Sequence, residues 1–209
     1  MKTLIVNNYL GRKKVFRVVE AVEKFSEYEV LSYAQTKELG RAAGNFDAII
    51  LTGSEARITR SEHVKLFSAV SELIKDSSTP TFGICFGHQL ACLTFGAEVG
   101  SLKSPVKRFE KIRVLKENEI FRGFGKGGFA WLAEYHHDYV KKRSLRRAGL
   151  ELLADSSSCE VEAVKHERKP FYGVQFHPEK AEIGGEKHFD GLKILKNFFN
   201  LCGSRRDIG

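Results

Sequence analysis

The first half of the chain alternates short apolar runs, bounded by turn residues, with longer segments in which apolar positions follow a helical period. Apolar runs at residues 4–6, 48–51 and 80–84 predict buried strands. Residues 15–25 and 61–76 carry apolar side chains on one helical face, and Ser61 is suited to be the N-cap of the second segment. This alternation predicts an α/β fold with a central, mostly parallel sheet and helices on both faces.

The second half of the chain has shorter strand-like pieces in place of long helical segments. A short helix is predicted at 88–95, and strands are predicted at 111–115, 129–132, 161–165 and 171–175. We expect these strands to form a smaller antiparallel part. A closing helix is expected at about 187–202, so residues 1–203 are predicted to be one domain and 204–209 a C-terminal tail.

The segment Gly83-Ile84-Cys85-Phe86-Gly87 has the form in which two glycines flank a nucleophile on a sharp strand-to-helix turn. Such a turn lifts the side chain of Cys85 clear of the sheet, and the free N–H groups of the following helix favour its thiolate. Cys85 could instead be a buried small apolar residue, as most thiols are. The predicted strand before it and helix after it favour the nucleophile.

The other three cysteines lack this strand-turn-helix context and are expected to be structural; they are Cys92, Cys159 and Cys202.

A base for this nucleophile is predicted at His177-Pro178-Glu179. Proline favours an extended backbone at the residue before it, and residues two apart on an extended chain point the same way. His177 and Glu179 therefore share a face, where the carboxylate can hold the imidazole. The pair could also be a half-exposed strand end or metal ligands, but no third ligand stands at a suitable spacing, so no metal site is expected.

A second group of possible ligands, His136-His137 with Asp138, forms a poor chelate because neighbouring residues on a strand point to opposite faces.

Composition narrows the class of protein. With 209 residues, of which 42% are hydrophobic, the chain can build one domain with a substantial core. It has no apolar run of bilayer length, no signal-peptide pattern and no CxxC spacing, so we expect a cytoplasmic protein with reduced thiols. The net charge of +8 is mostly scattered, and nucleic acid is not expected as a partner. One dense basic cluster, at 141–147, is expected to be a solvated loop or a partner-docking face.

Together the two motifs resemble the triad (class I) glutamine amidotransferases, whose elbow reads G-I-C-x-G-x-Q and whose late motif reads G-V-Q-F-H-P-E. The resemblance covers essentially the whole chain and implies that family's single-domain fold, with L-glutamine as substrate. It implies that Cys85 forms a γ-glutamyl thioester, that His177 is the base and that Glu179 orients it. The remaining implied site residues are Gly53 and Gln89, which would hold the substrate, and Ser54 and Phe86, whose N–H groups would form the oxyanion hole.

One departure from the family concerns the loop after the second strand. Where the family reads S-G-G-P, this chain has Thr52-Gly53-Ser54-Glu55. If the loop requires a positive φ at Ser54, serine costs about 1 kcal/mol that glycine would not. The oxyanion hole would then form only when something reshapes the loop.

Within the family, the stretch 161–172 is most similar to the glutaminase subunit of GMP synthase. His136 and Asp138 match a segment that marks the side facing the synthetase in that group, but Tyr135 stands where the group has serine. The chain has neither a P-loop nor an ATP pyrophosphatase motif. The resemblance therefore implies a separate ATP-dependent synthetase subunit that carries ATP and Mg²⁺, with no cofactor in this chain.

Three other readings stay open at this point. The chain could be the glutaminase subunit of anthranilate or aminodeoxychorismate synthase, whose corresponding segment starts with Tyr-His as this one does. It could be a stand-alone γ-glutamyl hydrolase-like enzyme, which needs no partner. It could also be a nearly inactive regulatory homologue in which the Ser54 loop has lost the oxyanion hole.

Overall fold

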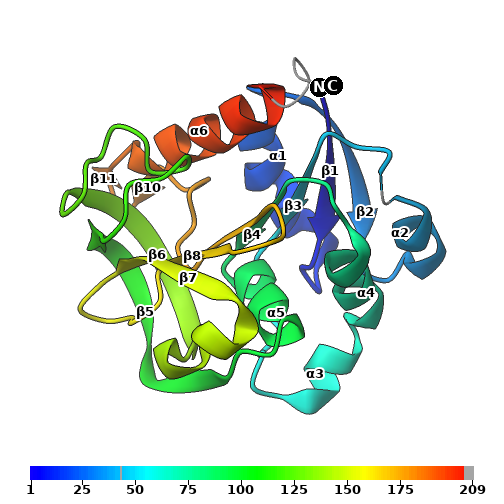
Figure 1. Ribbon diagram of the computed structural model, residues 1–209, viewed down its shortest axis with the longest axis horizontal. Helices are drawn as coiled ribbons and strands as arrows, with labels where there is room; N and C mark the ends of the chain where they lie inside the picture. The colour runs from blue at the N-terminus through cyan, green and yellow to red at the C-terminus, as the bar shows by residue number, and fades with distance from the viewer. Residues whose placement is uncertain (43, 205–209) are drawn as a thin grey trace.

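In the computed structural model, which describes residues 1–42 and 44–204, nine strands form one mixed sheet in the order β2-β1-β3-β4-β9-β8-β7-β5-β6 (Figure 1). The parallel part comprises β2 (Glu27–Ser32), β1 (Lys2–Asn7), β3 (Ala48–Leu51), β4 (Thr81–Ile84) and β9 (Phe171–Val174). The antiparallel part comprises β8 (Ala163–His166), β7 (Leu150–Asp155), β5 (Val99–Val114) and β6 (Phe129–Val140). The α/β fold with a smaller antiparallel part is therefore confirmed.

Helices cover both faces of the parallel part, as the apolar runs predict. Leu4 and Val6 of β1 belong to one buried cluster and Ile5 to the other, because successive side chains on a strand point to opposite faces. The first cluster includes apolar residues of α2 (Thr36–Ala42), α4 (Ser68–Asp76) and α5 (Phe86–Thr94). The second includes those of α1 (Phe16–Val22) and α6 (Asp190–Ser204).

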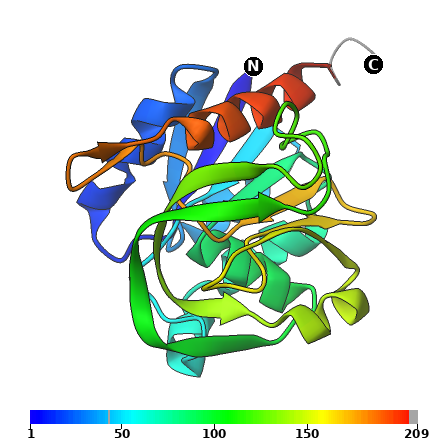
Figure 2. The ribbon, with the colours of Figure 1, turned by 90° about the vertical axis from the view of Figure 1, so that its left-hand side faces the viewer.

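The remaining elements are short: α3 (Ser61–Lys65), three 3-10 turns (Arg12–Val15, Lys142–Ser144 and Arg146–Ala148), and the hairpin of β10 (Glu182–Ile183) and β11 (Glu186–Lys187). The β5–β6 ribbon is long and curls away from the parallel strands, as the turned view shows (Figure 2). Within the described part of the chain, no helix has the length and apolar character needed to cross a bilayer.

The predicted helix at 61–76 is wrong in one respect, because it is two helices. The chain leaves helical geometry at Phe67, which has φ −106° and ψ 22° and is fully buried. Its ring packs against Tyr33 and Phe86, with ring centroids 4.6 Å apart in both pairs. Ser61 is not the N-cap; Arg60 occupies that position and makes no side-chain capping bond.

The end of the chain fits the predicted closing helix, with α6 beginning at Asp190 and ending at Ser204. The predicted tail at 204–209 lies outside the described residues apart from Ser204.

Candidate active site

Cys85 lies on a sharp turn between β4 and α5. Its backbone has φ 49° and ψ −105°, which makes it the one non-glycine residue with positive φ in the described chain. The two flanking glycines are required by close backbone contacts. A Cβ at Gly83 would lie 2.8 Å from the His88 nitrogen, and one at Gly87 would lie 2.5 Å from the Leu51 oxygen. The glycines thus permit a conformation that presents the thiol above the edge of the sheet.

The sheet brings the late motif to the same place. Strands β4 and β9 are parallel neighbours, and the Cys85 N–H donates to the Val174 carbonyl at 2.8 Å. Beyond β9 the chain continues beside β6, where the His177 N–H donates to the Ala133 carbonyl at 2.8 Å. Because carboxyl ends of parallel strands meet at one edge, residues far apart in sequence converge there.

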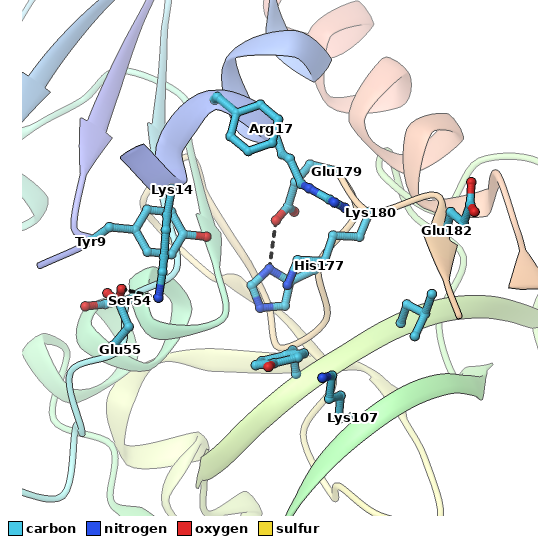
Figure 3. A pocket seen from close by; sticks show the side chains of 13 residues that line it. Tyr9, Lys14, Arg17, Ser54, Glu55, Lys107, His177, Glu179, Lys180 and Glu182 are labelled. Carbon is cyan, nitrogen blue, oxygen red and sulfur yellow. Dashed lines mark hydrogen bonds and ion pairs between the residues drawn. The ribbon is translucent and has the colours of Figure 1, made fainter. Parts of the chain in front are cut away.

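His177 and Glu179 form a buried pair, with Nδ1 of the imidazole 2.8 Å from Oε1 of the carboxylate (Figure 3). Burial alone would lower the pKa of His177, but the Glu179 charge and the contact with Cys85 outweigh it and raise that pKa to about 9. Burial likewise opposes the charge of Glu179, yet His177 lowers the pKa of this carboxyl. Below about pH 9 the pair is therefore an imidazolium held by a carboxylate.

The other thiols differ from Cys85 in their surroundings. Cys92 and Cys159 are buried, and burial raises the pKa of both thiols well above its usual range. None of the cysteines forms a disulfide in the part of the chain that the structure describes. Among the same residues, no group of three or more histidine, cysteine or acidic side chains is arranged to hold a metal.

Two adjoining cavities meet at this site. Cys85, Phe86 and Gln89 line the smaller one, of about 280 Å³, whereas His177 and Glu179 line the larger one, of about 700 Å³. Ser54 and Tyr135 line both cavities, so they form the wall between the nucleophile and the base. The Tyr135 carbonyl lies 3.8 Å from Cys85 Sγ.

The loop that carries Gly53 and Ser54 is fixed from below. Asn8 donates its backbone N–H to the Thr52 hydroxyl and its side-chain amide to the Thr52 carbonyl, both at 2.9 Å. Ser54 does not have a positive φ, and its hydroxyl accepts the Ala56 N–H at 3.0 Å. Serine therefore occupies this position without the left-handed strain that would have favoured glycine.

Gln89 and Gln175 connect α5 to the late motif beneath the thiol. Both hydrogens of the Gln89 amide are used, because Nε2 donates to the Asp138 carbonyl at 2.7 Å and to Gln175 Oε1 at 3.0 Å. The carbonyl oxygen is left as the group of Gln89 that can act on a ligand. Gln175 Nε2 lies 3.6 Å from Cys85 Sγ, so Gln175 touches the nucleophile, a contact that the sequence did not single out.

His136 and Asp138 are not on the surface, and the expectation that they face a partner is corrected. Their exposed fractions are 5% and 3%. Arg57 donates to both oxygens of the Asp138 carboxylate, at 2.6 and 2.8 Å. His136 lies in the interior, with Nε2 3.1 Å from Glu134 Oε2. Both residues line the smaller cavity, so they shape its wall.

A buried carboxyl pair lies behind this wall. Glu134 and Glu162 are fully buried, and Ser156 donates its hydroxyl to Glu162 Oε1 at 2.6 Å. Burial raises the pKa of Glu134 to about 8, and burial together with the Glu134 charge raises the pKa of Glu162 well above its usual range. These carboxyls therefore keep their protons at neutral pH in the folded state.

Replacing Glu134 with glutamine is expected to flatten the dependence of stability on pH. The folded chain holds the proton up to about pH 8, whereas the unfolded chain releases it near pH 4.5, so the free energy of unfolding falls as pH rises through that window. At about 1.4 kcal/mol per pKa unit, the wild type should lose up to about 4 kcal/mol more than the variant between about pH 5 and about pH 8. Urea unfolding across this range measures the difference, with the exposed Glu151→Gln as control. Equal pH slopes for wild type and Glu134→Gln would contradict the assignment.

Tyr9 is a site residue that sequence reasoning missed. A Cβ built on Gly53 would lie 3.2 Å from the Tyr9 hydroxyl and 3.1 Å from Cε1 of His177, so all three residues pack together. Burial and the charges of Glu179 and Cys85 raise the pKa of Tyr9 well above its usual range, which keeps the phenol neutral beside the base. Tyr9 follows β1 in a loop with no nucleophile pattern, and only the fold brings it to the site.

The comparison with protein families agrees with this geometry. Residues 4–200 match the model described as glutamine amidotransferase class-I. The chain belongs to the class-I glutamine amidotransferases. The resemblance carried by the two motifs is thereby confirmed at the level of the family, whose model also spans the loop of Ser54 and the wall of Tyr135.

Individual relatives of this amidotransferase are glutamine-hydrolysing subunits of GMP synthase. The one from Methanocaldococcus jannaschii is 43% identical over 134 residues, which are 63% of this chain and 65% of that protein. The one from Thermoplasma volcanium is 32% identical over 167 residues, 80% of this chain and 77% of that protein. The match thus spans about 65% of the length of the first of these relatives.

A solved structure supports the fold over the whole chain. A candidate GMP synthase subunit from Thermoplasma acidophilum superposes with a TM-score of 0.83 at 27% identity, covering 100% of this chain and 96% of the other.

Proposed function

We propose that this amidotransferase hydrolyses L-glutamine to glutamate and ammonia through a thioester on Cys85. The observation that carries the proposal is the buried His177–Glu179 pair beside a thiol held at a strained elbow. The contact between His177 and Cys85 and the raised pKa of His177 favour a thiolate–imidazolium pair at neutral pH.

In the first half of the reaction the Cys85 thiolate attacks the side-chain carboxamide carbon of glutamine, and the imidazolium of His177 gives its proton to the departing nitrogen. Ammonia leaves, and a γ-glutamyl thioester remains on Cys85. Neutral His177 then takes a proton from water as the water attacks the thioester, and glutamate leaves. Glu179 fixes the tautomer of His177 throughout and stabilises its charged form.

The smaller cavity suits glutamine. The N–H of Phe86, the first residue of α5, has no partner within its own helix, and the Ser54 N–H donates to no group in the described residues. We assign these two donors to the oxyanion. The carbonyl oxygen of Gln89, whose amide hydrogens are already used, can accept from the α-ammonium of the substrate. Gly53 keeps the base side of the cavity open, because a side chain there would meet His177 and Tyr9.

The ammonia is assigned to a separate ATP-dependent synthetase that makes GMP from xanthosine monophosphate. The relatives from Methanocaldococcus jannaschii and Thermoplasma volcanium, both named as glutamine-hydrolysing GMP synthase subunits, support this pathway. Free ammonia is mostly protonated in neutral water and no longer a nucleophile, so its release is useful only beside an enzyme that consumes it. ATP and Mg²⁺ belong to that partner in this proposal.

Glutamate release by the purified chain tests the proposal, alone and with a GMP synthetase subunit, ATP and xanthosine monophosphate. We expect release to rise when the partner and its substrates are present, and GMP to form with glutamine as nitrogen donor. Release that ignores this partner would leave the glutaminase in place and refute the GMP pathway. No release under any condition would refute both.

A further inference from the structure

The larger cavity beside His177 is surrounded by cations that no acidic side chain balances. Arg17, Lys107 and Lys180 line it together with Lys14 (Figure 3). Lys14 is paired with Glu55 at 2.6 Å, but the other three make no ion pair within the described residues. Lys107 and Lys180 instead lie over the ring of Tyr135, 5.2 and 4.4 Å from its centroid. Such contacts are weaker than a hydrogen-bonded ion pair, so both lysines are available to an incoming carboxylate.

The basic cluster at 141–147 differs in this respect. Three of its cations converge on one carboxylate, Glu98, with Arg143 at 2.5 Å, Arg147 at 2.8 Å and Lys141 at 3.7 Å. Much of its charge is therefore compensated within the chain. Of the two basic regions, the rim of the larger cavity has the stronger demand for an external acidic partner.

Exposed apolar side chains stand at the same opening. Phe16 and Tyr135 line the cavity and are 52% and 48% exposed. Leu10, whose N–H donates to Glu55 on the cavity wall, is 44% exposed. Large apolar and aromatic side chains combined with arginine and lysine at one concave site are typical of a protein-binding surface.

We propose that the rim of the larger cavity, formed by Arg17, Lys107, Lys180, Phe16 and Tyr135, docks an acidic segment of the partner synthetase. Carboxylates of that segment pair with the three cations, and its apolar side chains pack on Phe16 and Tyr135. Charge complementarity selects an acidic protein segment as the occupant, since the chain carries a net charge of +8 and these cations are unpaired. This inference rests on the proposed function for the partner's identity and adds the surface and chemistry of recognition.

The test compares charge reversal at the rim with the same change in the basic cluster. Arg17→Glu/Lys180→Glu removes two rim cations without touching the cavity that holds Cys85. Lys142→Glu/Arg146→Glu is the matched control, with an equal change in net charge on two exposed side chains. The milder Arg17→Gln/Lys180→Gln keeps the test decisive if the reversal disturbs folding, which circular dichroism and thermal unfolding report.

Binding to the GMP synthetase subunit is measured by titration at low and high salt. We expect the rim reversal to raise the dissociation constant by about 10-fold or more and the control to change it by less than about 2-fold. Wild-type affinity should fall as salt rises, and the rim variant should show a weaker salt dependence. Equal affinity of rim variant and wild type, or equal losses in rim and control variants, would overturn the inference.

If the wild type binds no GMP synthetase subunit, the proposed pathway fails, and a labelled oligo-glutamate peptide then tests the rim by itself. Binding to the wild type and the control but not to the rim variant supports the acidic docking surface. Equal binding to all three, or binding to none, overturns it.

Discussion

Replacing Cys85 with serine is expected to lower the rate of glutamine hydrolysis by about 10³-fold or more. Serine keeps nearly the same size at the strained elbow, where φ is 49°, so the fold should be retained. A hydroxyl, however, does not ionise beside His177 as a thiol does, and the attacking anion is lost. The adjacent groups remain, but they have no nucleophile to act on.

Steady-state glutamate release measures this effect, and Cys202→Ala is the control because Cys202 lies in α6, away from both cavities. Circular dichroism of both variants checks that each is folded. A Cys85→Ser variant that is folded and retains more than a tenth of wild-type activity would show that another group attacks the substrate.

Replacing Glu179 with glutamine is expected to reduce the rate by about 10²–10⁴-fold and to move its pH dependence. Glu179 is the strongest of the groups that raise the pKa of His177 against the effect of burial. Without its charge the imidazolium loses its proton at lower pH. The alkaline decline in rate, expected near pH 9 in the wild type, should therefore shift toward neutral pH in the variant.

A matched control is available in Glu182→Gln, because Glu182 lines the same cavity but is exposed and pairs with Lys187 at 3.3 Å. Its rate and pH profile should stay close to those of the wild type. If Glu179→Gln keeps the wild-type alkaline limb while losing activity, the lost activity has another origin than the charge held on His177.

Much of the fold could be predicted from the sequence where one local pattern decides the structure. The apolar run of β3 matches its prediction at both ends, since a strand buried on both faces has no polar residue to blur it. By contrast, β2 is an edge strand whose burial pattern is largely exposed, and it was missed. The break at Phe67 was also missed, because it depends on rings of Tyr33 and Phe86 that are distant in sequence.

The candidate site divides in the same way. Cys85, His177 and Glu179 stand in two short motifs, and one hydrogen bond between neighbouring strands joins them, so local patterns were sufficient. Tyr9, Gln175 and the cationic rim come from separate segments with no motif of their own, and only the folded chain brings them together. The Ser54 loop shows the limit of an aligned substitution, because its strain depended on a backbone angle that sequence does not contain.

The most direct test of the central claim is to trap the covalent intermediate. The protein is mixed with glutamine, quenched rapidly in acid, digested and analysed by mass spectrometry. We expect the peptide that contains Cys85 to carry one glutamyl group, removable by hydroxylamine and absent from Cys85→Ser. A glutamyl group on Cys92, Cys159 or Cys202 instead, or glutamate release by Cys85→Ser at the wild-type rate, would contradict the account.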